Sequence, residues 1–278
     1  MEAQCYLNGE IVPASRARIS ISDIGVLRGL GIYDGMITHN RKIFMFPDHI
    51  ARFRTCAEKM SLKVPVSDQE VEKAINELVQ YNVPEGKEAL IRILLTGGEA
   101  VGVIEYNPDT PTLFILVSEF KPIEDKYLTD GCSVMVVDYK RDHPEIKSTN
   151  YIETVLQQKH RKAAGALEIV YIHDGVVYEG GGSNVFIVKN NILITPKDEI
   201  VLGITRKVVL QLAKSQFKIE ERVLTEKEFY DADEIFITGS FKEVVPVVKV
   251  GERVVGNGTP GPVAKKIIGL FNDFTRAY

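Results

Sequence analysis

Short apolar runs separated by turn-forming dipeptides fill residues 167–196 and constrain the fold more than any other feature. The runs in LEIVYIHDGVVYEG and SNVFIVKNNILITP are interrupted by Asp174-Gly175 and by Asn190-Asn191. Such dipeptides favour the tight turns of β-hairpins, because their residues tolerate positive φ. Consecutive hairpins predict a mainly antiparallel sheet in this part of the chain.

The first 120 residues combine two predicted helices with strands. DHIARFRTCAEKMSL follows Pro47, and SDQEVEKAINELVQYN opens with Ser67 and Glu70 at the spacing of a capping box. EALIRILLTGG and TLFILVSEF have the composition of buried strands. The sequence therefore predicts an α+β fold.

Domain organisation follows from length and from one polar stretch. A chain of 278 residues with 45% hydrophobic side chains is long enough for two modest cores. KPIEDKYLTDG carries charges and a proline without periodicity, which is typical of a linker. We predict a small N-terminal domain over residues 1–120, a linker over 121–131, and a larger strand-rich domain over 132–278. A closing helix is predicted to bury a stripe formed by Ile267, Ile268, Phe271 and Phe274.

Composition excludes several classes of partner. The formal charge is -4 and no long basic run is present, which argues against nucleic acid and anionic membranes. Three cysteines, without metal-ligand spacing, favour reduced thiols in a cytoplasm. The start MEAQCYLNGE has no signal-peptide pattern, so a cytoplasmic protein is expected. The five histidines form no ligand cluster, and no metal site is predicted.

Lys147 stands at a predicted strand-to-helix joint. It lies between the apolar run CSVMVVDYK and a segment in which Ile152, Val155 and Leu156 recur at helical spacing. A lysine there is either ordinary surface charge or an amine held at the end of a sheet, where ligands often bind.

Glu179 ends a predicted strand and precedes three glycines, Ser183 and Asn184. Consecutive glycines let the backbone approach a bound group closely. A flexible hairpin loop with a solvated glutamate explains the same residues equally well.

Two further turns are candidates for binding an anion. Ile204 and Thr205 stand at the start of a predicted helix, where free N–H groups suit a phosphate, and Thr205 can also cap the helix. Gly239 and Ser240 follow a predicted strand and form a second possible cradle. Arg52 can grip a phosphate through two N–H groups, although each of these features also fits an ordinary surface role.

An amine, a carboxylate, two anion-binding turns and an arginine are the groups that pyridoxal phosphate requires. In order and spacing, DHIARF, IKSTNY, YEGGGSNVF, GITR and TGSFKEVVPV closely resemble the fold-type IV aminotransferases. That family contains branched-chain and D-amino acid aminotransferases and aminodeoxychorismate lyases, and the resemblance covers nearly the whole chain. It implies a two-domain fold with the active site between the domains, and a homodimer with that site near the subunit interface.

The resemblance also implies a role for each matching residue. Lys147 corresponds to the lysine that forms a Schiff base with the cofactor, and Glu179 to the partner of the pyridine nitrogen. Further cofactor contacts are implied for Arg52, Tyr151, Ser183, Asn184, Ile204, Thr205, Gly239 and Ser240. A carboxylate suits the nitrogen because an opposite charge keeps it protonated. Lys147 is then the amine that moves a proton as base and acid.

Two arginines are candidates for binding substrate carboxylates. Arg92 lies in the strand EALIRILLTGG, with Leu90 and Leu94 on its own face. We expect it to be buried, and a buried guanidinium needs a carboxylate from either a ligand or the protein. In relatives, the segment with Arg28 and Tyr33 lines the pocket and approaches the neighbouring subunit. Two arginines suit a dicarboxylate such as glutamate or 2-oxoglutarate.

The sequence departs from the two best-known specificity patterns of the family. The usual carboxylate trap of D-amino acid aminotransferases would fall on Gly97 and Glu99. The small carboxylate-binding turn of branched-chain enzymes is replaced by Ser240, Phe241 and Lys242, and the last two are predicted to contact substrate.

Arg28 and Arg92 match a less common group of D-amino acid aminotransferases. The expected reaction is therefore transamination between a D-amino acid, such as D-alanine or D-glutamate, and a 2-oxo acid. An L-branched-chain aminotransferase is the alternative, followed by an aminodeoxychorismate lyase. The presence of Lys147 and Glu179 argues against a non-catalytic protein that only binds the cofactor.

Overall fold

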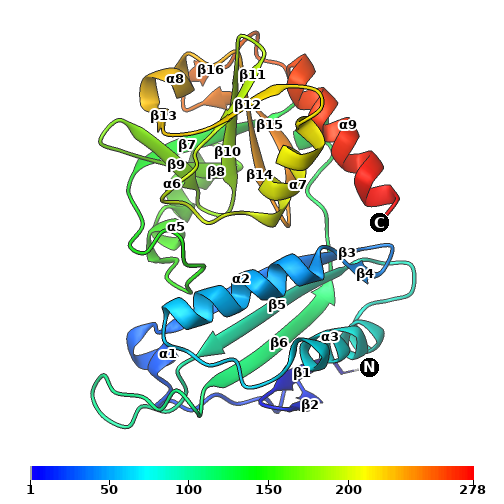
Figure 1. The fold of residues 1–278 in the computed structure, drawn as a ribbon, viewed down its shortest axis with the longest axis vertical. Coiled ribbons are helices and arrows are strands. Elements are labelled where there is room, and N and C mark those ends of the chain that lie inside the picture. The colour runs from blue at the N-terminus through cyan, green and yellow to red at the C-terminus, as the bar shows by residue number, and fades with distance from the viewer. Residues whose placement is uncertain (1) are drawn as a thin grey trace. The chain divides into compact units, whose positions relative to one another are not determined.

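The computed structural model describes residues 2–278, which divide into two compact units. Unit 1 contains the chain up to Lys121 together with Ile146–Asn150 and Tyr278. Unit 2 contains Pro122–Glu145 and Tyr151–Ala277. Figure 1 colours the chain from blue at the N-terminus to red at the C-terminus. Among the described residues, no helix is both long enough and apolar enough to span a membrane.

In the described part of unit 1, six strands form one sheet in the order β2-β1-β6-β5-β3-β4. The strands are β1 (Gln4–Leu7), β2 (Glu10–Pro13), β3 (Gly31–His39), β4 (Lys42–Ile43), β5 (Ala89–Thr96) and β6 (Thr112–Glu119). Neighbouring strands are antiparallel. Two helices, α2 (Phe46–Lys59) and α3 (Asp68–Asn82), pack on one face of this sheet (Figure 1). The sequence correctly predicted both helices, and the capping box of Ser67 and Glu70 is present.

Buried and less buried side chains alternate along β5, so the sheet has one covered face and one open face. Ile91, Ile93 and Leu95 are fully buried and belong to the core beneath the helices. The intervening residues point to the other face, because successive side chains of a strand alternate. Arg92 is one of these and is exposed, so the expectation that it is buried was wrong. Leu90 and Leu94 share its face and are half-buried.

A short helix, α1 (Ile24–Arg28), is fastened to the ends of two strands. Its N-cap Asp23 is fully buried and accepts a hydrogen bond of 2.7 Å from the Gly25 N–H. The hydroxyls of Thr96 and Thr112 donate to the same carboxylate, each at 2.7 Å. Asp23 therefore fixes the segment that carries Arg28 to β5 and β6.

In the described part of unit 2, ten strands form one sheet in the order β12-β11-β10-β14-β15-β7-β8-β9-β13, with β16 beside β15. They are β7 (Cys132–Asp138), β8 (Glu168–His173), β9 (Val176–Gly180), β10 (Asn184–Lys189), β11 (Ile192–Thr195), β12 (Lys218–Glu221), β13 (Leu224–Thr225), β14 (Glu234–Gly239), β15 (Glu243–Val250) and β16 (Arg253–Val254). The predicted hairpins β8–β9 and β10–β11 are present, and both residues of each turn dipeptide have positive φ. The sheet is mixed, however, because β7 pairs parallel with β8 and β15, and β11 with β12.

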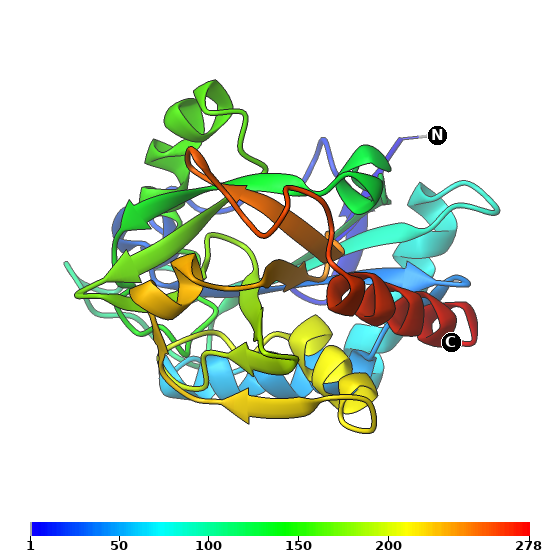
Figure 2. The same cartoon turned by 90° about the horizontal axis from the view of Figure 1, so that it is seen from above.

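Unit 2 also contains helices, some of which pack on this sheet. They are α4 (Lys126–Thr129), α5 (Ile152–Leu156), α6 (Gln158–Ala163), α7 (Ile204–Ala213), α8 (Glu226–Tyr230) and α9 (Pro262–Arg276). In Figures 1 and 2, α7 and α9 lie side by side, and they pack on β14 and β15. Within α9, Ile267 and Phe271 are buried as predicted, whereas Ile268 and Phe274 are half-buried.

Two segments differ from the sequence prediction. The stretch predicted as a plain linker contains the short helix α4. The apolar residues after Lys147 lie on α5, where Ile152, Val155 and Leu156 are all more than 60% exposed. Helical spacing in that segment reflects a surface helix and not a buried face.

Candidate active site

Lys147 is held against the edge of β3 in unit 1. The Tyr33 N–H donates to the Lys147 carbonyl at 3.0 Å, and the Thr149 N–H donates to the Gly31 carbonyl at 2.9 Å. The Lys147 N–H in turn points to the buried Cys56 Sγ at 3.4 Å. Lys147, which follows β7 and precedes α5 in the chain, is therefore held along the edge of the sheet of unit 1.

The amine of Lys147 has a specific neighbour. Its Nζ donates to Tyr33 Oη at 3.0 Å and lies 4.4 Å from the centre of the Tyr33 ring. A cation this close to an aromatic ring is attracted to the ring face. Tyr33 therefore orients the amine that the sequence singled out.

The next residue of β3, Asp34, organises the opposite face of the strand. It is fully buried, and Arg52 on α2 donates to both of its carboxylate oxygens, Nε to Oδ2 and Nη2 to Oδ1, each at 2.8 Å. His49, also on α2, lies 2.7 Å from Oδ1 through its Nδ1. Sequence reasoning selected Arg52 as a phosphate ligand but missed Asp34, which fixes the plane of its guanidinium.

The contacts with Arg52 and His49 determine the charge state of Asp34. Burial alone raises the pKa of Asp34, but Arg52 and His49 outweigh burial and hold the pKa well below its usual range. Burial lowers the pKa of His49 despite the nearby carboxylate. Asp34 is therefore an anion and His49 a neutral ring at pH 7.

In unit 2, Glu179 is the penultimate residue of β9, and its carboxylate is buried, with 5% of the residue surface exposed. Its Oε1 accepts a 2.8 Å hydrogen bond from Arg141 Nη1, and its Oε2 accepts one of 3.0 Å from the Val201 N–H. The alternative of a solvated glutamate is therefore wrong. Arg141 was missed, because nothing in the segment KRDHPEIK distinguishes it from a surface arginine.

The glycine loop after Glu179 folds back on itself. The Gly180 N–H donates to the Ser183 carbonyl at 2.7 Å. Ser183 Oγ donates to Glu168 Oε2 at 2.6 Å, and Asn184 donates through Nδ2 to the Val201 carbonyl at 2.8 Å. Both side chains are buried, and these two hydrogen bonds hold the loop in its conformation.

The N-terminus of α7 and the end of β14 lie next to each other. Gly203 is the N-cap of α7 and its N–H donates to Asn184 Oδ1 at 3.1 Å. Across the sheet, Asn184 is paired in register with Thr238 at the end of β14. Thr205 is the second residue of the helix and not its cap, contrary to the sequence interpretation.

This junction fits an anion. Within the described residues no side chain caps α7, and the hydroxyl of Thr238, 1% exposed, has no hydrogen-bond partner. A helix N-terminus offers N–H groups and a positive dipole end to a phosphate. Ile204 and Thr205 begin α7 on one side of the junction, and Gly239 and Ser240 follow Thr238 on the other.

The remaining candidates from the sequence occupy different surroundings. Tyr151 is the N-cap residue of α5, and Phe241 and Lys242 are half-buried in the turn between β14 and β15. Lys242 Nζ donates to Glu168 Oε2 at 2.9 Å. Arg28 is exposed and donates to the Leu27 carbonyl at 2.8 Å.

Arg92 lies opposite Gly35 of β3 in the sheet register. Its side chain makes no hydrogen bond or ion pair with any residue among 2–278. A salt bridge within the fold, the alternative role for this arginine, is therefore not formed in the described chain.

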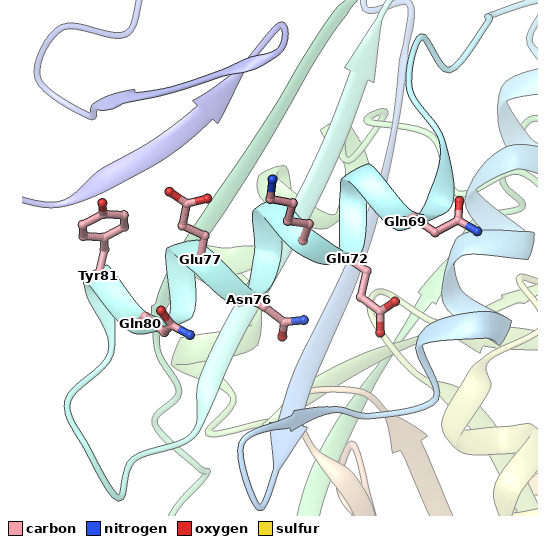
Figure 3. Close-up of a pocket in the computed structure, with 7 residues that line it drawn as sticks. Gln69, Glu72, Asn76, Glu77, Gln80 and Tyr81 are labelled. Atoms are coloured by element: carbon pink, nitrogen blue, oxygen red, sulfur yellow. The ribbon is translucent and has the colours of Figure 1, made fainter.

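A depression on α3 has the wrong construction for an active site. Figure 3 shows its side chains spread along one helix and pointing in different directions. The labelled residues are Gln69, Glu72, Asn76, Glu77, Gln80 and Tyr81. They all come from α3, so the described residues bring no second element to converge on a ligand.

Comparison with known proteins shows the family of this chain. The family described as amino-transferase class IV matches residues 31–250. A Methanocaldococcus jannaschii protein provisionally named a branched-chain-amino-acid aminotransferase is 35% identical, over 96% of this chain and 95% of its own. A D-alanine aminotransferase from Bacillus licheniformis is 30% identical, over 94% of this chain and 93% of its own.

A solved structure shares the fold. The branched-chain amino acid aminotransferase of T.th., crystallised with pyridoxamine 5'-phosphate, superimposes with a TM-score of 0.91 and 26% identity, covering 100% of this chain and 95% of that one. Class IV aminotransferases use pyridoxal 5'-phosphate. The amine of Lys147, the buried carboxylate of Glu179 and the anion-binding junction at α7 are groups that fit this cofactor. The protein is a member of the class IV aminotransferases.

Proposed function

We propose that this aminotransferase moves an amino group between a D-amino acid, such as D-alanine or D-glutamate, and a 2-oxo acid such as 2-oxoglutarate. The observation that carries the proposal is the position of Arg92, an exposed and unpaired guanidinium on the same face of the sheet as Tyr33. Tyr33 is the residue that contacts the amine of Lys147.

The register of β3 and β5 supports this role for Arg92. Tyr33 is opposite Leu94, and Arg92 is two residues before Leu94 in β5, opposite Gly35. Diagonal neighbours across antiparallel strands are roughly 7 to 8 Å apart, a gap that long side chains cross. Because Gly35 has no side chain, the stem of Arg92 is not obstructed there. A substrate carboxylate bound by Arg92 therefore lies near the reacting amine, and Arg28 is proposed as a second carboxylate contact.

The residues proposed to hold the cofactor contact different parts of it. Ile204, Thr205, Gly239 and Ser240, all in unit 2, bind the phosphate through N–H and hydroxyl donors. The resemblance of the DHIARF motif to the family proposes Arg52 as a further phosphate ligand. Glu179 keeps the pyridine nitrogen protonated, because a carboxylate stabilises a nearby positive charge. Tyr151, Ser183 and Asn184 complete the proposed set of cofactor contacts.

Lys147 is proposed both to bind the cofactor covalently and to move the substrate proton. Bound pyridoxal phosphate supplies an electron sink for the substrate Cα. Lys147 would take the proton from the substrate Cα as a base and deliver it as an acid to C4' of the bound cofactor, and Tyr33 keeps its amine oriented for both transfers. Arg141 holds the Glu179 carboxylate in place.

L-branched-chain amino acids are the second candidate substrate class. The names of the Methanocaldococcus jannaschii relative and of the structure solved with pyridoxamine 5'-phosphate favour it. Such substrates carry an apolar side chain, for which the half-buried Phe241 is a suitable contact.

We also propose that the enzyme is a homodimer. Unit 1 exposes a group of large apolar side chains: Ile21, Val26, Val101, Val103 and Ile104. Their two segments are joined, since the Ala100 N–H donates to the Ser22 carbonyl at 2.9 Å. An exposed apolar patch of this kind is typical of a protein interface. Sedimentation velocity is expected to give twice the chain mass.

A cytoplasmic location is proposed from the cysteines. Cys5, Cys56 and Cys132 are all buried, and within residues 2–278 they are unpaired. Free thiols are typical of reducing compartments.

The test of substrate class is a panel of half-reactions. The holoenzyme is mixed with single D- or L-amino acids, and the change in the cofactor's visible spectrum is followed. D-alanine and D-glutamate are expected to react faster than L-leucine and L-valine. A preference of tenfold or more for L-leucine and L-valine would replace the D-specific assignment with the branched-chain one.

A further inference from the structure

Glu168, at the start of β8, is a buried carboxylate that the proposed reaction does not use. It is 5% exposed and accepts hydrogen bonds from Lys242 Nζ at 2.9 Å, Ser183 Oγ at 2.6 Å and the Gly182 N–H at 3.3 Å, all on Oε2. Its Oε1 accepts from the Ile169 N–H at 3.0 Å. The carboxylate is thus satisfied on both oxygens.

These contacts join two loops of unit 2. One is the glycine loop over residues 180–183, and the other is the turn over residues 239–242 that carries Ser240. The loops also touch directly, because a Cβ built on Gly239 would lie 2.9 Å from the Gly182 carbonyl oxygen. The Lys242 N–H donates to the Gly239 carbonyl at 3.1 Å, so the ammonium that reaches Glu168 belongs to the same closed turn.

Energetics favour keeping Lys242 on Glu168. Burial raises the pKa of Glu168, but Lys242, together with hydrogen bonds from Ser183 and the Ile169 N–H, lowers the pKa below its usual value, so the carboxylate remains charged. Removing the partner of a buried charge is strongly destabilising, because the remaining charge has no compensation. To bind a substrate carboxylate, the Lys242 ammonium would have to leave Glu168 as a buried charge without its partner.

We propose that Lys242 is a positioning residue that, through Glu168, fixes the Ser240 turn against the glycine loop, and that it does not bind the substrate carboxylate. The inference rests on the proposed function, in which Ser240 contacts the phosphate of the cofactor and Ser183 of the glycine loop contacts the cofactor. It replaces the sequence-based assignment of Lys242 to substrate. Of the three basic residues predicted to contact substrate, Arg28 and Arg92 then remain as candidates for binding its carboxylate.

The experiment compares four variants with the wild type: Lys242→Met, Lys242→Arg, Glu168→Gln/Lys242→Met, and Lys249→Met as a matched control. Lys249 also lies on the β14–β15 hairpin, but its partner Glu252 is 98% exposed. Three quantities are measured. They are the dissociation constant of the apoprotein for pyridoxamine 5'-phosphate, hydrogen exchange in residues 180–183 and 239–242, and kcat and KM for the amino donor.

Lys242→Met is expected to weaken pyridoxamine 5'-phosphate binding by roughly ten- to a hundredfold, the effect of losing a charged hydrogen bond. Exchange should accelerate in both loops, including the glycine loop that does not contain the substitution. Lys242→Arg should lie within about threefold of the wild type, since it keeps the ion pair. The double variant should be no more impaired than Lys242→Met, since both lack the same contact. Lys249→Met should change nothing.

Two results would overturn the proposal. If Lys242→Met raises KM for carboxylate substrates while cofactor affinity and exchange stay unchanged, Lys242 binds substrate directly. If the double variant is impaired far more than Lys242→Met, the two residues act independently and the pairing with Glu168 is not the cause. A wild type without transaminase turnover would refute the proposed function alone, because the exchange experiment does not depend on turnover.

Discussion

Arg141 donates a 2.8 Å hydrogen bond to Glu179, so the carboxylate assigned to the pyridine nitrogen is shared with a guanidinium. Both side chains are largely buried, at 13% and 6% exposure. A buried ion pair holds its geometry well but leaves an uncompensated charge when one partner is removed. Arg141 and Glu179 therefore have to be considered as one unit.

Arg141→Met is expected to lower the free energy of unfolding by about 3 to 5 kcal/mol, because Glu179 is left as a buried charge without its partner. Arg141→Lys keeps the charge and should cost less. Chemical denaturation measures both. A loss below about 1 kcal/mol for Arg141→Met would show that water or another group replaces the guanidinium.

Glu179→Gln is expected to slow the half-reaction by orders of magnitude while the cofactor stays bound. Glutamine keeps the shape of the side chain but removes the charge that holds the pyridine nitrogen protonated. Stopped-flow spectroscopy with excess amino donor measures the rate. A rate within about twofold of the wild type would mean that another group serves the nitrogen.

Lys147→Ala is expected to abolish covalent cofactor attachment and turnover without unfolding the protein. The lysine side chain is not part of a core cluster, and its removal costs mainly the contact with Tyr33. Mass spectrometry after borohydride reduction detects attachment, and Lys162→Ala, at an exposed lysine, is the control. Normal turnover by Lys147→Ala would refute the whole site.

Asp34→Asn is expected to reduce stability in a pH-dependent manner. The pKa of Asp34 is depressed in the folded protein, so its contribution is present above the unfolded pKa of about 4 and is lost as pH falls through the lower folded value. The stability difference between wild type and Asp34→Asn should stay constant from pH 5 to 7 and shrink below about pH 4. A difference that grows on acidification would contradict the ionised assignment.

Arg92→Leu is expected to weaken binding of dicarboxylic substrates by roughly ten- to a hundredfold, through loss of a charge-assisted hydrogen bond. Thermal stability should barely change, since the side chain is exposed and has no partner within residues 2–278. Arg16→Leu, at another exposed arginine of unit 1, is the control. A large drop in melting temperature with unchanged affinity would assign Arg92 to the fold.

Local features of the fold could be predicted from the sequence. The turn at Asp174-Gly175 and the capping box of Ser67 and Glu70 depend on neighbouring residues only, so a short stretch of sequence specifies them. The position of Lys147 between a strand and a helix was predictable for the same reason.

Pairs distant in sequence could not be predicted. Glu168 meets Lys242 across 74 positions, and Arg141 meets Glu179 across 38. Neither pairing leaves a pattern in a single sequence, because it depends on how the strands are ordered in the sheet. The exposure of Arg92 was missed because alternation along a strand reveals two faces but not which of them the helices cover.

The alternation of Tyr33 and Asp34 along β3 restricts how this gene can vary. One strand supplies the contact for Lys147 on one side and the anchor for Arg52 on the other. A single-codon insertion or deletion within β3 would turn every following side chain to the opposite face and exchange the two roles. Natural variants are therefore expected to differ in length at the loops flanking β3, with the spacing inside Gly31–His39 kept constant.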